Sequence, residues 1–147
     1  MIEFQQKIAF TDQLTGLYNS PGAVRFCERI AAQYPLGDYA SCFINLKNLK
    51  YINRQMDNHA GDQAMRQYAR GLSRLLDPER EQMARLGGDN FFALVRKDNL
   101  ENFIQLATAM PMEVTHEGRA HSITLSAWIG VYPAAGGENP RDLLDNA

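Results

Sequence analysis

The stretch ARLGGDNFFALV, residues 84–95, holds two apolar runs joined by a Gly-Gly pair and an acidic residue. Glycine adopts the positive φ values that tight hairpin turns require, so the stretch predicts a strand, a turn and a second strand. Taken alone, this is an ordinary β-hairpin. The acidic residue beside the glycines also fits the tip of an active site, and the rest of the chain must decide between the two.

The composition is that of one globular domain. The chain has 147 residues, of which 45% are hydrophobic and 22% charged, enough to bury a core of its own. With 15 basic and 17 acidic residues the net charge is −2, which argues against a nucleic-acid partner and a polybasic membrane surface. We expect no membrane contact from this segment and a cytoplasmic location, although a longer parent protein could carry a membrane anchor.

Apolar spacing and turn residues divide the chain into helices and strands. Asn19 or Ser20 can cap the first helix, and Gly118 marks a second hairpin turn near Glu117. Cys27 and Cys42 have no metal or disulfide spacing and are expected to be reduced core residues. We expect a helix at 19–34, a strand at 39–46, a short helix, a loop at 57–61 and a longer helix within 47–76, a helix at 99–110, a hairpin at 112–133 and a last helix from 139.

This order of elements predicts an α+β fold, with a central, mostly antiparallel sheet and flanking helices. We expect a single domain over residues 1–147, in which residues 1–10 are a linker or the end of an N-terminal helix. The last helix begins with good capping residues, Asn139 and Pro140, yet the sequence stops about two turns later. We therefore expect that this helix is truncated at residue 147 and that other domains belong to the same longer chain.

Five short motifs occur in order along the chain. They are DQLTGLYN (12–19), INLKNLKYIN (44–53), AGDQAM (60–65), RLGGDNF (85–91) and SAWIGV (126–131). In this order and at these separations they resemble the GGDEF family, the diguanylate cyclase domains of bacterial signalling, from about Asp12 to the last residue. The resemblance implies a sheet like that of polymerase palms and nucleotidyl cyclases. It also implies a homodimer that joins two GTP molecules into cyclic di-GMP, each domain holding one GTP.

The metal-binding positions of the family are poorly matched. The first metal-binding Asp falls on Asn45, and the backbone carbonyl that also binds metal falls on Leu46. Lys47 stands at the second acidic position of this motif. In the hairpin the resemblance implies catalytic and metal-binding roles for Asp89, while Asn90 replaces the second acidic residue, giving GGDNF in place of GGDEF.

The positions that hold the nucleotide are better matched. Asn53 and Asp62 fall on the guanine-contacting Asn and Asp of the family. A lysine and the backbone after the central strand hold phosphates in the family, and the hairpin glycines are retained. The resemblance thus implies a substrate-binding set of Asn48, Leu49, Lys50, Asn53, Asp62, Gly87 and Gly88.

These differences indicate how much chemistry remains. Mg²⁺ prefers hard oxygen ligands, with carboxylates supplying the charge, and a carboxamide offers an oxygen without charge. Loss of one electrostatic element of a preorganised site costs about 3–4 kcal/mol of transition-state stabilisation. Three family carboxylates, at 45, 47 and 90, are replaced here. We therefore expect Mg²⁺ as the cofactor only if any metal binds at all.

Three interpretations follow. The first is a degenerate GGDEF domain of a cyclic di-GMP signalling protein, catalytically inactive, that binds GTP and regulates a neighbouring domain. The second is an active but weak diguanylate cyclase, because Asn45 can still coordinate weakly and the substrate phosphates carry much of the metal binding. The third is an interaction or dimerisation module that binds no nucleotide.

Four further residues are weaker candidates. The family's product-binding motif falls on residues 78–81, where Pro78 replaces its Arg, so we expect no product binding and a solvated Glu81. His116 and His121 flank the second hairpin turn, either as exposed strand residues or as a two-His metal site. Trp128 is expected to fill the core or a dimer contact.

Overall fold

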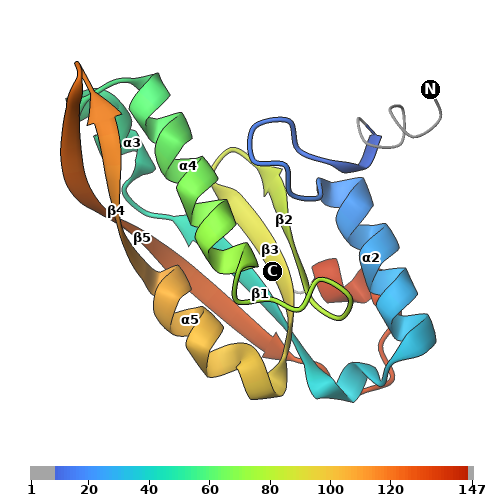
Figure 1. Ribbon diagram of the computed structural model, residues 1–147. Helices are drawn as coiled ribbons and strands as arrows, with labels where there is room; N and C mark the ends of the chain where they lie inside the picture. The colour runs from blue at the N-terminus through green and yellow to red at the C-terminus, as the bar shows by residue number, and fades with distance from the viewer. Residues whose placement is uncertain (1–8, 146–147) are drawn as a thin grey trace.

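The structure, a computed structural model, describes residues 9–145. Residues 1–8 of the expected N-terminal segment and residues 146–147 of the expected last helix lie outside the described residues. One antiparallel sheet has the strand order β2-β3-β1-β5-β4, with helices on both faces (Figure 1). The expected α+β fold is therefore confirmed. The strands are β1 (Tyr39–Leu46), β2 (Gln82–Gly87), β3 (Asn90–Arg96), β4 (Ala109–His116) and β5 (Arg119–Pro133). The helices are α2 (Ser20–Gln33), α3 (Leu49–Gln55), α4 (Asn58–Ser73) and α5 (Leu100–Thr108), with short 3-10 turns η1 (Leu36–Asp38), η2 (Lys97–Asn99) and η3 (Pro140–Leu144).

Strand β1 is the centre of the sheet. It pairs with β3 on one edge and with β5 on the other. Side chains alternate between the two faces of a strand, so Cys42 and Ile44 pack with α4 and α5, while Tyr39 packs with α2 and η3. Both faces of β1 are covered along most of its length, which explains the nearly continuous apolar run YASCFINL.

The helix starts follow from their capping residues. Asn19 accepts a hydrogen bond from the backbone N–H of Gly22 at 2.9 Å and starts α2, as expected. The expected short helix, break and longer helix are present, but the loop expected at 57–61 is too long. Asp57 accepts from the Ala60 N–H at 2.8 Å, so α4 begins at Asn58 and only residues 56–57 separate it from α3. Gly61 lies inside this helix rather than in a loop. It is needed there because a Cβ would collide with the side chain of Asn53 on α3.

Two other boundaries differ from the expectation. The helix expected at 99–110 ends at Thr108, and β4 begins at Ala109, where Met110 pairs with Leu125 of β5. The last helix is a 3-10 turn rather than an α-helix, although Asn139 caps it by accepting from the Arg141 N–H at 3.1 Å. Among residues 9–145, no helix has the length and apolar character needed to cross a membrane.

Glu81 is buried rather than solvated, which contradicts the expectation. Its side chain is 3% exposed and joins three segments of the chain. It accepts hydrogen bonds from the backbone N–H groups of Asp77 at 2.9 Å and Arg96 at 2.8 Å, and from Asn99 Nδ2 at 3.1 Å. A carboxylate bonded in this way holds the α4–β2 connection against the end of β3, so its role here is structural.

We predict that Glu81→Ala lowers the free energy of unfolding by about 3 kcal/mol, because it leaves buried N–H groups without an acceptor. Glu79→Ala, two residues away and exposed, should change it by less than about 0.5 kcal/mol. Urea denaturation followed by circular dichroism measures both values. Equal effects of the two substitutions would contradict the structural role of Glu81.

Candidate functional site

The GGDNF hairpin brings its tip to the end of β1. Gly88 and Asp89 form the turn, and Gly87, with a φ of 139°, pairs with Asn90 across it. The backbone N–H of Leu46 donates to the carbonyl of Asp89 at 3.0 Å. The two segments expected to form one site, at the end of the strand and at the hairpin tip, therefore lie side by side.

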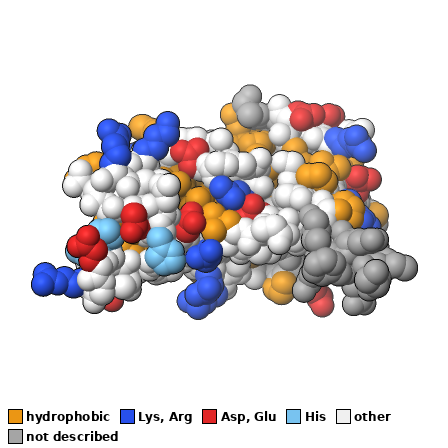
Figure 2. Space-filling model, turned by 90° about the horizontal axis from the view of Figure 1, so that it is seen from above, with side chains coloured by type: hydrophobic (Ala, Val, Ile, Leu, Met, Phe, Trp, Pro, Cys, Tyr) orange, Lys and Arg blue, Asp and Glu red, His pale blue; other side chains and the backbone are white. Residues whose placement is uncertain are grey.

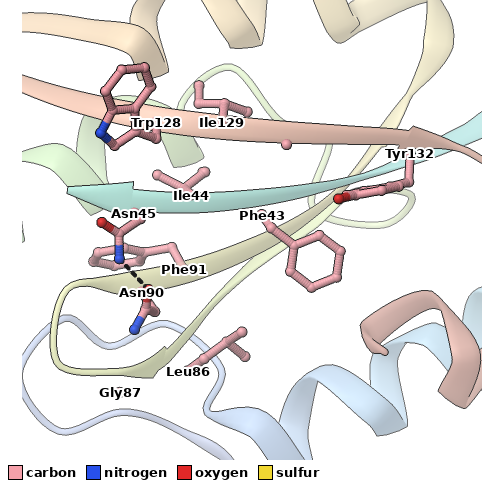
Figure 3. Close-up of a pocket in the computed structure, with 11 residues that line it drawn as sticks. Phe43, Ile44, Asn45, Leu86, Gly87, Asn90, Phe91, Trp128, Ile129 and Tyr132 are labelled. Carbon is pink, nitrogen blue, oxygen red and sulfur yellow. Dashed lines mark hydrogen bonds between the residues drawn. The ribbon is translucent and has the colours of Figure 1, made fainter. Parts of the chain in front are cut away.

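Asn45 and Asn90 are bonded to each other at this junction. They occupy paired positions in β1 and β3, and Asn45 Nδ2 donates to Asn90 Oδ1 at 2.6 Å (Figure 3). Both side chains are exposed. The pair keeps two strands in contact at the edge of the site, and it does so with neutral groups.

The N-terminal DQLTGLYN motif is bonded to the hairpin through Asp12 and Arg85. Arg85 donates from Nε to the Gly88 carbonyl at 2.9 Å and from its guanidinium to Asp12 at 3.0 Å. Asp12 also accepts from the N–H and hydroxyl of Thr15. Burial raises the pKa of Asp12, but the Thr15 hydrogen bonds and the Arg85 charge outweigh it and hold this pKa below its usual value.

Lys47 and Trp128 form a contact on the same side of the sheet as Asn45. Lys47 follows Asn45 by two residues, and Trp128 pairs with Asn45 from β5. The Lys47 ammonium lies 3.8 Å from the centroid of the Trp128 ring. Trp128 is 66% exposed, so the expectation that it fills the core is wrong.

The segment after β1 is anchored to β5 by the side chain of Asn48. Asn48 continues the pairing of β1 with β5, because its Nδ2 donates to the Thr124 carbonyl at 2.8 Å and its Oδ1 accepts from the Ser126 N–H at 3.0 Å. Leu49 is buried, and Lys50 is exposed. Of this predicted phosphate-binding segment, only Lys50 presents a side chain to solvent.

Asn53 lies on α3 and Asp62 on α4, two helices that pack against each other. Asn53 lies against Gly61, the residue before Asp62. Asn53 Oδ1 is buried and accepts no hydrogen bond from any residue that the structure describes. Buried amide oxygens are normally bonded, so Asn53 Oδ1 is an exception, and it packs against Gly61 rather than facing solvent.

An open groove of about 660 Å³ lies beside the amide pair, and sequence reasoning missed it (Figure 3). Its walls come from β1, β5 and the β2–β3 hairpin. The sequence contained a signal for this groove, because the alternation of side chains along β1 and β5 places the apolar residues next to Asn45 on one face of the sheet. The lining includes Phe43, Asn45, Leu86, Asn90, Trp128 and Tyr132.

The donor set at the hairpin tip does not fit a magnesium site. In the part of the chain that the structure describes, no three His, Cys, Asp or Glu side chains gather closely enough to hold a metal ion. Asn45 and Asn90 are bonded to each other, with Asn45 Nδ2 as the donor and Asn90 Oδ1 as the acceptor. Lys47, a cation, lies on the same face, and Asp89 alone supplies a carboxylate.

The two histidines lie apart from this site, at the β4–β5 turn. Their ring centroids are 6.0 Å apart, and His116 Nδ1 is 3.3 Å from Asp57 Oδ2, the carboxylate that caps α4. Figure 2 shows histidine and acidic side chains next to one another on this face. His116 and His121 are half-buried rather than exposed. His116 therefore connects the hairpin to α4, and among residues 9–145 the pair has no third metal ligand.

Comparison with known proteins agrees with this architecture. The family described as "Diguanylate cyclase, GGDEF domain" matches residues 9–147. The response regulator PleD of Caulobacter vibrioides is 27% identical over 99% of this chain and 34% of its own length. An uncharacterized protein of Mycobacterium tuberculosis is 31% identical over 95% of this chain and 23% of its own length.

Solved structures share the fold. The coiled coil and GGDEF domain of DgcB from Caulobacter crescentus, in complex with c-di-GMP, gives a TM-score of 0.75 at 20% identity, covering 99% of this chain and 80% of that one. The chain spans about a third or less of the length of the curated relatives above.

We predict that the double variant Asn45→Asp, Asn90→Glu makes stability depend on divalent cations. Two carboxylates in place of hydrogen-bonded amides repel each other and should lower the free energy of unfolding by about 1–2 kcal/mol without metal. Added Mg²⁺ or Mn²⁺ should recover this loss in the variant and leave the wild-type protein unchanged. Thermal unfolding with and without each cation measures the effect, and an equal response of both proteins would contradict it.

Proposed function

This chain belongs to the GGDEF family of diguanylate cyclase domains, and we propose that it is a degenerate member, which binds GTP without condensing it. In this proposal the domain binds GTP, and it passes a signal that depends on this binding to a neighbouring domain of the same cytoplasmic protein. The observation that carries the proposal is the hydrogen bond between Asn45 and Asn90, at the place where the resemblance implies acidic residues. The active, weak cyclase and the module without nucleotide are the alternatives that the tests below and a product assay distinguish.

The loss of catalysis follows from charge. Joining two GTP molecules requires a 3′-hydroxyl to attack an α-phosphate and pyrophosphate to leave, and neutralisation of phosphate charge by metal ions drives such reactions. The amides of Asn45 and Asn90 supply no charge to hold a metal, and Asp89 is the one carboxylate at the hairpin tip. We therefore propose that Asp89 and Asn90 keep the shape of the catalytic hairpin without its activity.

The proposed binding of GTP depends on residues where α3 and α4 pack together. Guanine presents two adjacent donors, N1–H and N2–H, which a carboxylate such as Asp62 can accept together. Asn53, which lies against Gly61, the residue before Asp62, is the second polar side chain at this junction. The phosphates would then extend toward Lys50, the backbone of Asn48 and Leu49, and the glycines of the hairpin. A GGDEF-type homodimer stays a prediction of the family resemblance.

We predict that Asp62→Asn weakens GTP binding at least about tenfold, because the amide loses the charge and one of the acceptors that face guanine. The wild-type protein should prefer GTP over ATP, since adenine lacks the paired donors. Isothermal titration calorimetry on the full-length protein measures both affinities. Asp38→Asn, an exposed carboxylate next to the start of β1, is the matched control and should bind like the wild type.

A wild-type protein that gives no heat with GTP would overturn the proposal and favour the interaction module. Equal binding of GTP by the wild type and by Asp62→Asn would show that the guanine base binds elsewhere in the molecule.

A further inference from the structure

The charges beside the amide pair favour an anion rather than a cation. Residues 45–50 include two lysines, Lys47 and Lys50, and no acidic residue. The hairpin tip opposite adds one carboxylate, Asp89. Arg85, the basic residue of the hairpin, is engaged with Asp12 and the Gly88 carbonyl. Lys47, which reaches toward Trp128 of β5, is therefore a cation that a ligand at the end of β1 would meet.

Lys47 is held where it can serve this role. Its ammonium lies over the Trp128 ring, and Trp128 is opposite Asn45 in the sheet and lines the groove. The contact keeps the charge on the face that carries Asn45 and Asn90. Both Lys47 and Trp128 are exposed, so the ammonium remains open to a ligand while the ring restrains it.

The amide pair is compatible with an anion. Its single hydrogen bond uses one N–H of Asn45, so the two carboxamides keep further N–H groups that can donate to phosphate oxygens. A divalent cation at the same place would find one carboxylate, the neutral amide oxygens of Asn45 and Asn90, of which the latter already accepts a hydrogen bond, and a neighbouring ammonium. A polyphosphate therefore matches this surface better than a metal ion does.

We infer that Lys47 takes over the charge-neutralising role of a metal, so that this chain binds the phosphates of GTP without a divalent cation. The inference rests on the proposed GTP binding at Asn53 and Asp62, and it adds the way in which the phosphates are held. Lys47 is then a ligand-binding residue, and GTP occupancy is independent of the magnesium concentration.

The test is calorimetric titration of GTP into the full-length protein, once with excess EDTA and once with Mg²⁺. The two dissociation constants should agree within about threefold. Lys47→Gln should weaken binding by about tenfold in EDTA, because the ammonium-to-phosphate interaction is lost, while Lys47→Arg should retain it. Arg119→Gln, an exposed cation at the β4–β5 turn, is the control and should bind like the wild type.

The outcomes separate this inference from the function on which it rests. GTP binding that requires Mg²⁺ would overturn the inference and leave the proposed function intact. Binding in EDTA that is equal in the wild type and Lys47→Gln would show that Lys47 has no part in it. No GTP binding under either condition would overturn both.

Discussion

Strand β1 is hydrogen-bonded along both edges and packed on both faces, and the positions of the other elements follow from it. Its apolar residues separate two clusters, one under α3, α4 and α5 and one under α2 and η3. A strand held in this way cannot shift its register without moving every side chain to the wrong face. The two residues at its end, Asn45 and Leu46, therefore have fixed positions, and the hairpin tip is tied to them through Asn90 and the carbonyl of Asp89.

This arrangement bears on the proposed degenerate site, because the hairpin is supported by groups that need no metal. The hairpin geometry depends on Gly87 and Gly88, on Arg85 and on the Asp12 loop, none of which needs a metal. Two amides at 45 and 90 bond directly where two acids would repel each other without a cation. In the proposed degenerate site, the amides at 45 and 90 would thus stabilise the hairpin without a metal ion.

Much of this fold could be predicted from local signals. The β1 strand, both hairpins and the Asn19 cap were confirmed because apolar runs, glycine-containing turns and the Asn-Ser-Pro start of α2 act over a few residues. The loop at 57–61 was predicted too long because the apolar helical spacing is interrupted there, whereas Asp57 caps α4 and Gly61 makes room for Asn53. These roles depend on packing between α3 and α4, which a single sequence does not display.

The same limit applies to the site. The residues at the strand end and hairpin tip were found through the family motifs, and the structure brings them together. Their binding and catalytic roles stay predictions. Burial of Glu81, exposure of Trp128 and the position of Lys47 over its ring all depend on contacts between segments that are far apart in the sequence. Periodicity within one strand or helix contains no signal for such contacts.

The most direct measurement is a product assay on the full-length protein. It would be incubated with GTP and Mg²⁺, and separately with Mn²⁺, and the nucleotides would be separated by chromatography. The account predicts unchanged GTP with either cation. Cyclic di-GMP above the level of an Asp89→Ala control would contradict it, because the amides at 45 and 90 would then support a working metal site.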